Sequence, residues 1–135
     1  MNNCIFCKII NKEIPADIIY EDDQALAFLD IRPVSRGHAL VVPKKHSDDF
    51  LSSEDQVLED LMPKIKKIAA AVMKATNAEG INISTNHGAA AGQVVFHLHF
   101  HLIPRFGGDR LTAWPHQEIE PKTRAEIAEA IKRNL

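Results

Sequence analysis

Short apolar runs bounded by turn-forming residues recur along the chain and predict β-strands. Only Glu-Asp-Asp-Gln separates the first two runs, so these strands should pair as a hairpin. The third run stops at Pro43, and the last run is the longest. The predicted strands cover residues 18–20, 25–29, 38–42, 81–86 and 95–104.

Helical spacing dominates the middle of the chain. Apolar residues recur at intervals of three and four between residues 57 and 73, while lysines occupy the other face. Ser53 and Gln56 match a capping box, which predicts that a long helix begins just after Ser53. Pro63 lacks a backbone donor and should kink this helix rather than end it.

Short helices are predicted at both ends of the chain. One is expected within residues 5–13, and another follows a second capping box formed by Thr123 and Glu126. Strands joined by short turns favour an antiparallel sheet of about five strands, with the long helix crossing between the third and fourth. The predicted fold class is α+β. The chain is expected to form one domain over residues 1–135, with a core that ends near residue 114 and a tail over residues 115–135.

The composition and charge of the chain limit which classes of binding partner are expected. The 135 residues are 45% hydrophobic and 25% charged, which is ordinary for a globular protein. A formal charge of −2 lacks the basic field that nonspecific nucleic-acid binding needs, so no nucleic-acid partner is expected. Neither a secretory signal nor a membrane-spanning run is visible, which predicts a cytoplasmic protein without a membrane partner. In a reducing compartment, Cys4 and Cys7 indicate a metal site or a redox pair.

The segment from His97 to Ile103 carries the strongest chemical signal. Side chains alternate between the faces of a strand, so His97, His99 and His101 should share one face and the intervening apolar residues the other. Imidazoles transfer protons near neutral pH and attack phosphorus as nucleophiles. A metal-binding row or a solvated sheet face is the competing interpretation.

A loop of small residues, 88–95, stands directly before the histidines. Glycine and alanine let backbone N–H groups approach an anion closely, although most such loops are simple turns. Its position beside the histidines predicts a phosphate-binding loop.

These motifs resemble the histidine triad (HIT) family, and within it the Hint branch. The family's alternation of three histidines with apolar residues is matched at residues 97–103, with Gly92 and Gln93 upstream. Further similarity to the branch lies in residues 4–10, 11–15, 27–31, 37–46, 86–88 and 114–115. The resemblance implies a HIT-like fold and cleavage of nucleotides at the α-phosphate.

The resemblance also implies roles for individual residues. His99 would attack the α-phosphorus and form a covalent nucleotidyl-histidine, which water then hydrolyses. A backbone carbonyl near His97 would fix the reactive tautomer of His99. Either His101 or His38 would assist proton transfer to the leaving group.

Substrate contacts follow from the same resemblance. Asp30 would accept hydrogen bonds from the ribose hydroxyls, against the alternative of a turn-forming aspartate. Asn86, Gln93 and the amides of Gly92, Val94 and Val95 would hold phosphate oxygens. The family often has serine or threonine where this chain has Val94, so that hydroxyl is missing. The base would contact Ile5, Phe6, Ile9, Phe28, Ile31 and Leu40, for which simple core packing is the rival interpretation.

Some family members with an N-terminal Cys-x-x-Cys bind zinc. The resemblance implies a structural zinc site formed by Cys4, Cys7, His46 and His97, since a closed site needs four ligands. Two reduced thiols beside a hydrogen-bonded histidine pair are the alternative. No organic cofactor is expected.

The resemblance favours a nucleotidyl hydrolase acting on purine nucleoside phosphoramidates or related AMP conjugates. Alternatives are a dinucleoside polyphosphate hydrolase, a metallohydrolase whose triad histidines bind the catalytic metal, and a non-catalytic nucleotide-binding module. Related proteins form homodimers through the long helix and the fourth strand, and Trp114 would close the site of a neighbouring subunit. His87 and His116 are expected at the surface.

Overall fold

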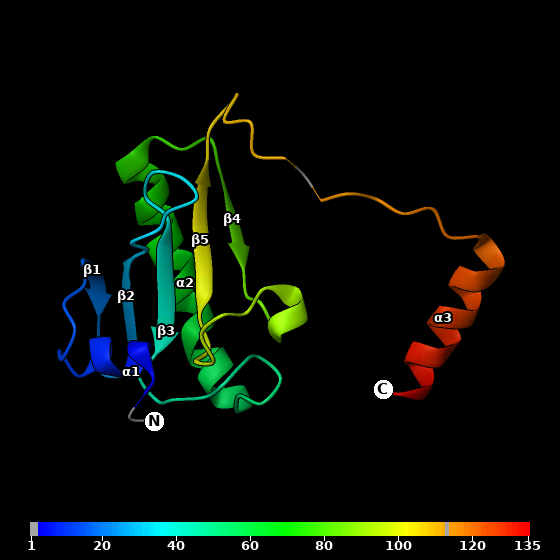
Figure 1. Ribbon diagram of the computed structural model, residues 1–135, viewed down its shortest axis with the longest axis horizontal. Helices are drawn as coiled ribbons and strands as arrows, with labels where there is room; N and C mark the ends of the chain where they lie inside the picture. The colour runs from blue at the N-terminus through cyan, green and yellow to red at the C-terminus, as the bar shows by residue number, and fades with distance from the viewer. Residues whose placement is uncertain (1–2, 113) are drawn as a thin grey trace.

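The computed structural model describes residues 3–112 and 114–135, which form one antiparallel sheet of five strands and three α-helices. The strands follow the order β1-β2-β3-β5-β4, and α2 crosses between β3 and β4 (Figure 1). The predicted α+β class and the long crossover helix are confirmed. The elements are α1 (Ile5–Ile10), β1 (Ile18–Glu21), β2 (Ala25–Leu29), β3 (Ala39–Pro43), α2 (Asp55–Thr76), β4 (Gly80–Ser84), β5 (Phe100–Arg105) and α3 (Pro121–Arg133).

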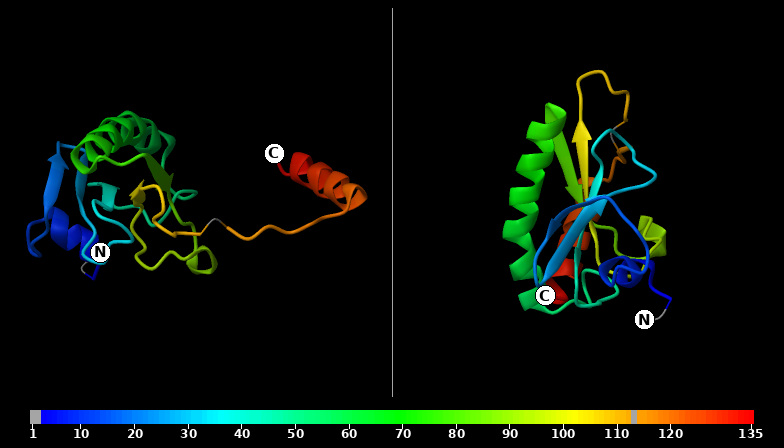
Figure 2. Two further views of the ribbon diagram at one scale, coloured as in Figure 1. Left: turned by 90° about the horizontal axis from the view of Figure 1, so that it is seen from above. Right: turned by 90° about the vertical axis from the view of Figure 1, so that its left-hand side faces the viewer.

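The sheet is buried on both faces in its middle. α2 packs on one face and α1 on the other (Figure 2). The strand alternation sorts side chains accordingly: Ala25 and Ala27 face α2, whereas Leu26 and Phe28 face α1. Small residues on the first face let the long helix approach closely. Within the described residues, no helix has the length and apolar character needed to cross a bilayer.

Both predicted capping boxes are wrong. The Ser53 hydroxyl lies 2.7 Å from the hydroxyl of Ser47 and donates to the carbonyl of Asp49 at 2.6 Å, so Glu54 is the N-cap of α2. Thr123 lies inside α3, which begins with Pro121 at its first turn. The fixed φ of proline and its missing donor suit that position. Pro63 lies within α2, which continues to Thr76.

The last strand is shorter than predicted. β5 begins at Phe100, not near Val95. Its pairing with β4 ends where β4 ends, at His101 and Ser84, and its pairing with β3 ends at Phe100 and Val41, although β3 itself continues to Pro43. Before that point the chain bonds elsewhere, with Leu98 N–H donating to the carbonyl of Ser47 at 2.7 Å.

The chain after β5 leaves the body of the molecule. Residues 114–120 follow an extended path beyond the β4 side of the sheet, and α3 lies well away from the sheet (Figures 1 and 2). No residue of α3, all of which the structure describes, is buried.

Gly37 fixes the entry into β3. Its φ is +92°, and a Cβ at this position would lie 2.5 Å from Cγ2 of Thr76 on α2. Glycine is therefore required both by the backbone conformation and by the approach of the helix. Gly37 thereby fixes the backbone directly before His38, one of the predicted site residues.

We expect Gly37→Ala to lower the free energy of unfolding by about 2–4 kcal/mol, because backbone strain and overpacking add. Gly108→Ala is the matched control, since its φ is +75° but nothing lies within 4 Å of the added Cβ. The control should lose about 1 kcal/mol from strain alone. Urea unfolding of both variants measures the difference, and equal losses would contradict the packing argument.

Candidate active site

Four histidines line one face of the sheet beside α1. His97 and His99 stand just before β5, His101 lies within it, and His38 precedes β3. The ring centroids of His99 and His101 are 5.0 Å apart, and those of His38 and His101 are 5.2 Å apart. The intervening Leu98, Phe100 and Leu102 belong to the core beneath α2. The predicted division of this segment into a histidine face and an apolar face therefore holds in the structure, although only part of it is a strand.

The tautomer of His99 follows from one short hydrogen bond. Its Nδ1 lies 2.7 Å from the carbonyl oxygen of His97, and a carbonyl can only accept. Nδ1 therefore carries the proton, and Nε2 of the neutral ring has a free lone pair. Burial lowers the pKa of His99 below its ordinary value, against the opposing effect of the His97 carbonyl. The ring packs edge-on against Phe6 of α1, with centroids 5.1 Å apart.

A second series of hydrogen bonds fixes His38 and His101. The backbone N–H of Val34 donates to Nδ1 of His38 at 3.0 Å, so Nε2 of the neutral His38 ring carries the proton. That Nε2 lies 3.0 Å from Nδ1 of His101, which must accept. Neutral His101 therefore holds its own proton on Nε2. The Nε2 atom of His101 is therefore a hydrogen-bond donor, whereas the Nε2 atom of His99 carries a lone pair.

Burial keeps these rings neutral near pH 7. It lowers the pKa of His101 to about 4, with further contributions from His99 and His38. Burial also lowers the pKa of His38, and nearby Asp30 only partly opposes this. The proton positions above therefore apply across the physiological range.

Asp30 adjoins the histidines at the end of β2. Its Oδ1 accepts from the backbone N–H of Arg32 at 2.8 Å, which is the turn-forming contact expected of the alternative interpretation. Its Oδ2 lies 3.6 Å from Nε2 of His38, beyond hydrogen-bond distance. The side chain is partly exposed, so Asp30 both shapes the turn and offers a carboxylate oxygen beside the histidines.

The small-residue loop contains a 3₁₀ turn, Ala89–Ala91, between two glycines with positive φ, Gly88 and Gly92. Buried Gln93 braces this turn from inside. Its Oε1 accepts from the N–H of Gly88 at 2.8 Å, and its Nε2 donates to the carbonyls of Asp48 and Val95. The side chain of Gln93 therefore positions the loop. The amides of Gly88, Ala91, Gly92 and Gln93 are already paired within it, which includes the Gly92 amide that was predicted to hold phosphate.

The residues predicted to contact the base divide by burial. A compact cluster on the α1 side of the sheet contains Phe6, Ile9, Phe28 and Leu40, with Val95 packed against it. Three of the predicted substrate residues are largely exposed: Ile31 and Val94 at 86% and Trp114 at 84%. Ile5 is 44% exposed, and Asn86 is half-buried beside Gly92. Phe6 of this cluster packs against His97 and His99, whereas Trp114 lies on the extended chain after β5.

Sequence reasoning missed the segment after β3. The carbonyl of Pro43 accepts from Nε2 of His97 at 2.8 Å, and the carbonyls of Ser47 and Asp48 hold Leu98 and Gln93. These contacts use backbone oxygens, which any residue type supplies. No sequence signal could have revealed them.

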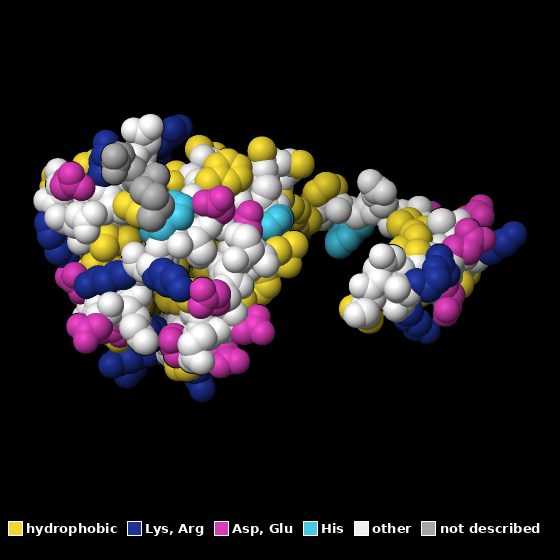
Figure 3. All heavy atoms as spheres, turned by 90° about the horizontal axis from the view of Figure 1, so that it is seen from below, with side chains coloured by type: hydrophobic (Ala, Val, Ile, Leu, Met, Phe, Trp, Pro, Cys, Tyr) yellow, Lys and Arg dark blue, Asp and Glu magenta, His cyan; other side chains and the backbone are white. Residues whose placement is uncertain are grey.

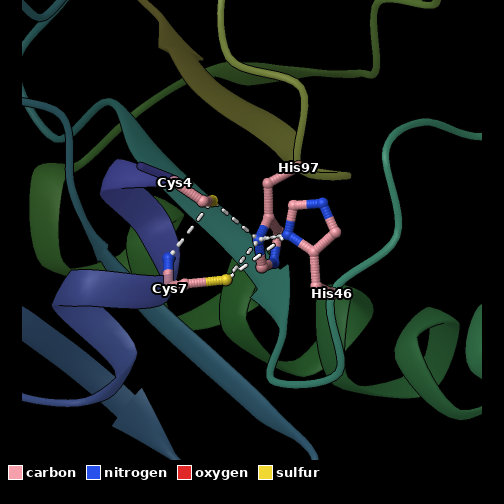
Figure 4. Close-up of side chains that lie close together, drawn as sticks. All are labelled: Cys4, Cys7, His46 and His97. Carbon is pink, nitrogen blue, oxygen red and sulfur yellow. Dashed lines mark hydrogen bonds between the residues drawn. The ribbon is translucent and has the colours of Figure 1, made fainter. Parts of the chain in front are cut away.

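A second cluster lies directly behind the triad. Cys4, Cys7, His46 and His97 converge from α1, the segment after β3 and the start of the triad, with ligand atoms all within 4.8 Å of one another (Figure 4). Each thiol lies 3.3 Å from an imidazole nitrogen: Cys4 Sγ from His97 Nδ1, and Cys7 Sγ from His46 Nδ1. Burial and the neighbouring Cys4 raise the pKa of Cys7 to about 11.

The hydrogen bonds around this cluster fit a bound cation. Nε2 of His97 donates to Pro43, and Nε2 of His46 donates to a carboxylate oxygen of Asp48 at 2.9 Å. In neutral rings, both Nδ1 atoms are therefore lone-pair acceptors, yet they face each other at 3.1 Å. Such a pair is repulsive unless a positive charge lies between them. Two thiols and two imidazoles are the donor set that zinc prefers, and the cluster could hold a metal.

A third group consists of Asp30, His38 and His101, whose possible ligand atoms all lie within 4.8 Å of one another. It differs from the cysteine–histidine cluster in where the protons lie. Here Nε2 of His38 donates to Nδ1 of His101, so the facing atoms already form a donor–acceptor pair. The triad thus does not present converging lone pairs to one metal ion.

Comparison with known proteins identifies this arrangement. The chain matches the HIT domain over residues 11–108, and it belongs to the HIT family. An uncharacterized HIT-like protein of Borreliella burgdorferi is 52% identical over 81% of this chain and 80% of its own. An adenosine 5′-monophosphoramidase of Schizosaccharomyces pombe is 38% identical over 98% of both chains. An Arabidopsis thaliana adenylylsulfatase is 38% identical over 99% of this chain and 70% of its own.

Solved structures confirm the fold. A Streptococcus mutans protein superimposes with a TM-score of 0.93 and 44% identity, over 99% of this chain and 86% of its own. A zinc-bound histidine triad family protein from Mycobacterium smegmatis superimposes with a TM-score of 0.78 and 38% identity, over 96% and 98% of the two chains.

Proposed function

We propose that this chain is a nucleotidyl hydrolase that cleaves purine nucleoside phosphoramidates or related AMP conjugates at the α-phosphate. The observation that carries the proposal is the pairing of two opposite tautomers: His99 presents a lone pair and His101 a proton on adjacent rings. A nucleophile beside a proton donor is what displacement of a poor leaving group requires.

The first step forms a covalent intermediate. Nε2 of His99 donates its lone pair to the α-phosphorus, and the bond from phosphorus to the leaving group breaks. The leaving group takes its proton from Nε2 of His101 while a proton from solvent replaces it, so the His101 ring, whose Nδ1 is held by His38, remains neutral. In the second step, a water oxygen attacks phosphorus and releases its proton to solvent. The P–N bond to His99 breaks, and AMP leaves.

The surroundings suit a ribonucleotide. Asp30 offers a carboxylate oxygen to the ribose, and the cluster containing Phe6 and Phe28 provides an apolar wall for the base. The amides of Val94 and Val95, which follow the loop braced by Gln93, would hold phosphate oxygens. The Schizosaccharomyces pombe relative is named an adenosine 5′-monophosphoramidase and the Arabidopsis thaliana relative an adenylylsulfatase, and both names describe cleavage of AMP conjugates, which supports this substrate class. A dinucleoside polyphosphate hydrolase and a nucleotide sensor are the rival functions.

We also propose that Cys4, Cys7, His46 and His97 hold a structural zinc ion. The facing Nδ1 atoms of His46 and His97 and the zinc-bound mycobacterial relative support this. Zinc bound there would supply positive charge between the four ligands and tie α1 to the triad. The cytoplasmic location, the absence of a nucleic-acid partner and the role of Trp114 stay predictions.

His99→Asn should lower turnover of an AMP phosphoramidate by about 10⁴-fold or more, because the nucleophile is lost. Binding of AMP, measured by calorimetry, should survive. Native enzyme quenched with substrate labelled at the α-phosphate should carry a label that resists alkali and is lost in acid. His87→Asn is the control and should behave as the native enzyme. Retained turnover in His99→Asn would falsify the proposed mechanism.

His101→Ala should slow substrates in proportion to how much their leaving group needs a proton. Release of an amine should fall by about 10²–10⁴-fold, whereas release of p-nitrophenolate from its AMP ester should change little. Steady-state kinetics with both substrates test this. Equal losses would show that His101 acts on both leaving groups alike and is not the proton donor.

Elemental analysis of purified protein should find one zinc per chain, and Cys7→Ser should lose it. Saturation at a thousand times the Kd stabilises a folded protein by about 4 kcal/mol, so chelation should lower the unfolding free energy by a comparable amount. Asn3→Ser, an exposed neighbour of Cys4, is the control and should keep both metal and stability. Unchanged stability on chelation would contradict a structural role.

A further inference from the structure

Cys4 and Cys7 lie close enough to form a disulfide bond. They are the two cysteines of the chain, both thiols are free, and their sulfur atoms lie within 4.8 Å of each other. Figure 4 shows both side chains directed toward the imidazoles of His46 and His97. Residues three apart in a helical turn have α-carbons about 5 Å apart, within the range that a disulfide spans. The two sulfurs can therefore bond after rotation of the side chains alone.

Small oxidants can reach both sulfurs from solvent. One hollow, of about 430 Å³, is lined in part by Cys4 and Phe96, and a second, of about 330 Å³, by Cys7 and Lys8. His46 borders both hollows, and Figure 3 shows histidine side chains at the surface of the body on the side where α1 lies. Cysteines with such access are open to oxidation, whereas fully buried thiols are inert.

A disulfide would remove what the cysteine–histidine cluster needs. In the reduced protein, each sulfur supplies either a thiolate ligand to a bound cation or an S–H donor to the imidazole nitrogen 3.3 Å away. A disulfide supplies neither of these. The Nδ1 atoms of His46 and His97, 3.1 Å apart, would then be facing lone pairs with no charge or donor between them. The two rings therefore cannot keep this separation once the cysteines are joined.

His46 is the ring that would move. Its side chain is 14% exposed, whereas His97 is fully buried and held by the carbonyl of Pro43. His46 lies two residues before Asp48, whose carbonyl accepts from Nε2 of Gln93 at 2.7 Å. The same Gln93 side chain braces the small-residue loop through Oε1. Movement of the His46 segment would therefore reach this loop through the hydrogen bonds of Gln93.

We propose that Cys4 and Cys7 form a reversible disulfide in the presence of hydrogen peroxide, and that this modification expels the metal ion and loosens the loop braced by Gln93. One thiolate takes OH from the peroxide to give a sulfenic acid, and hydroxide leaves. The second thiolate attacks the sulfenic sulfur, which forms the S–S bond and releases another hydroxide. Solvent protons convert both hydroxides to water. The two cysteines lose two electrons, the peroxide gains them, and thiol exchange reverses the change.

The separate parts of this proposal have different foundations. Release of a metal ion rests on the structural zinc site proposed above, and an effect on AMP binding rests on the proposed function. Formation of the Cys4–Cys7 bond depends on neither of them. The experiments below therefore measure the bond, the metal and the loop separately.

Hydrogen peroxide added to zinc-loaded protein should give single chains without alkylatable thiols and with a disulfide within the chain. A chromogenic chelator should detect zinc released in step with the loss of thiols, and dithiothreitol with added zinc should reverse both changes. Because the chain has two cysteines, alkylation before mass spectrometry distinguishes this bond from methionine oxidation. Surviving thiols, a disulfide between chains, or a disulfide formed with zinc retained would each overturn the proposal.

Hydrogen exchange measures the effect on the loop. In the oxidised protein, the protected amides of residues 88–95 should exchange about tenfold faster, because the brace of Gln93 is weakened, whereas those of α2 should be unchanged. A double variant, Cys4→Ala with Cys7→Ala, lacks both sulfurs and should match the oxidised protein with or without peroxide. Loop exchange that stays the same in fully oxidised native protein would overturn the proposal.

Binding of AMP, measured by calorimetry, connects this change to the candidate active site. Affinity should fall about tenfold on oxidation and return with dithiothreitol and zinc, the scale on which partners of metal ligands act. The double variant should show no response to peroxide. A reduced protein that does not bind AMP would contradict the proposed function, while thiol counting and hydrogen exchange would still decide the disulfide and its effect on the loop.

Discussion

The carbonyl oxygen of His97 accepts the Nδ1 proton of His99 at 2.7 Å, and this bond determines where a lone pair is available. The position of that carbonyl depends on its own residue being fixed. The His97 ring is buried, held by Pro43 on one nitrogen and by the cysteine–histidine cluster on the other. Orientation of His99, the proposed nucleophile, thus depends on a residue that takes no chemical part in the proposed reaction.

His97 and its neighbours also connect the elements that surround the candidate site. Phe6 of α1 contacts both His97 and His99, so the helix that contains Cys7 and begins just after Cys4 also packs on the proposed nucleophile. On the other side, the segment that carries His46 holds the proposed phosphate loop through Asp48 and Gln93. The apolar cluster around Phe6, the ring of His99 and this loop therefore meet at the cysteine–histidine cluster. A displacement of any one of these three elements would displace the other two.

Local patterns in the sequence were enough to predict the sheet, the crossover helix and the face shared by the histidines. These features depend on spacing, which a single sequence contains. The two capping boxes failed because Ser53 bonds to Ser47 and Asp49, and because Pro121 starts α3 earlier than Thr123. The start of β5 and the bracing role of Gln93 depend on partner strands and backbone carbonyls distant in sequence. Residue identity alone does not encode such partners.

The cysteine–histidine cluster also constrains the order in which the chain can fold during its synthesis. Cys4 and His97 are separated by 93 positions, so the cluster is incomplete until most of the protein has left the ribosome. The first helix emerges early and has no final place until the last strand arrives. Closing so long a loop slows assembly more than it weakens the product. Metal retention would then report that both ends of the core have come together, and a truncated chain would be left with unsatisfied thiols exposed to oxidation.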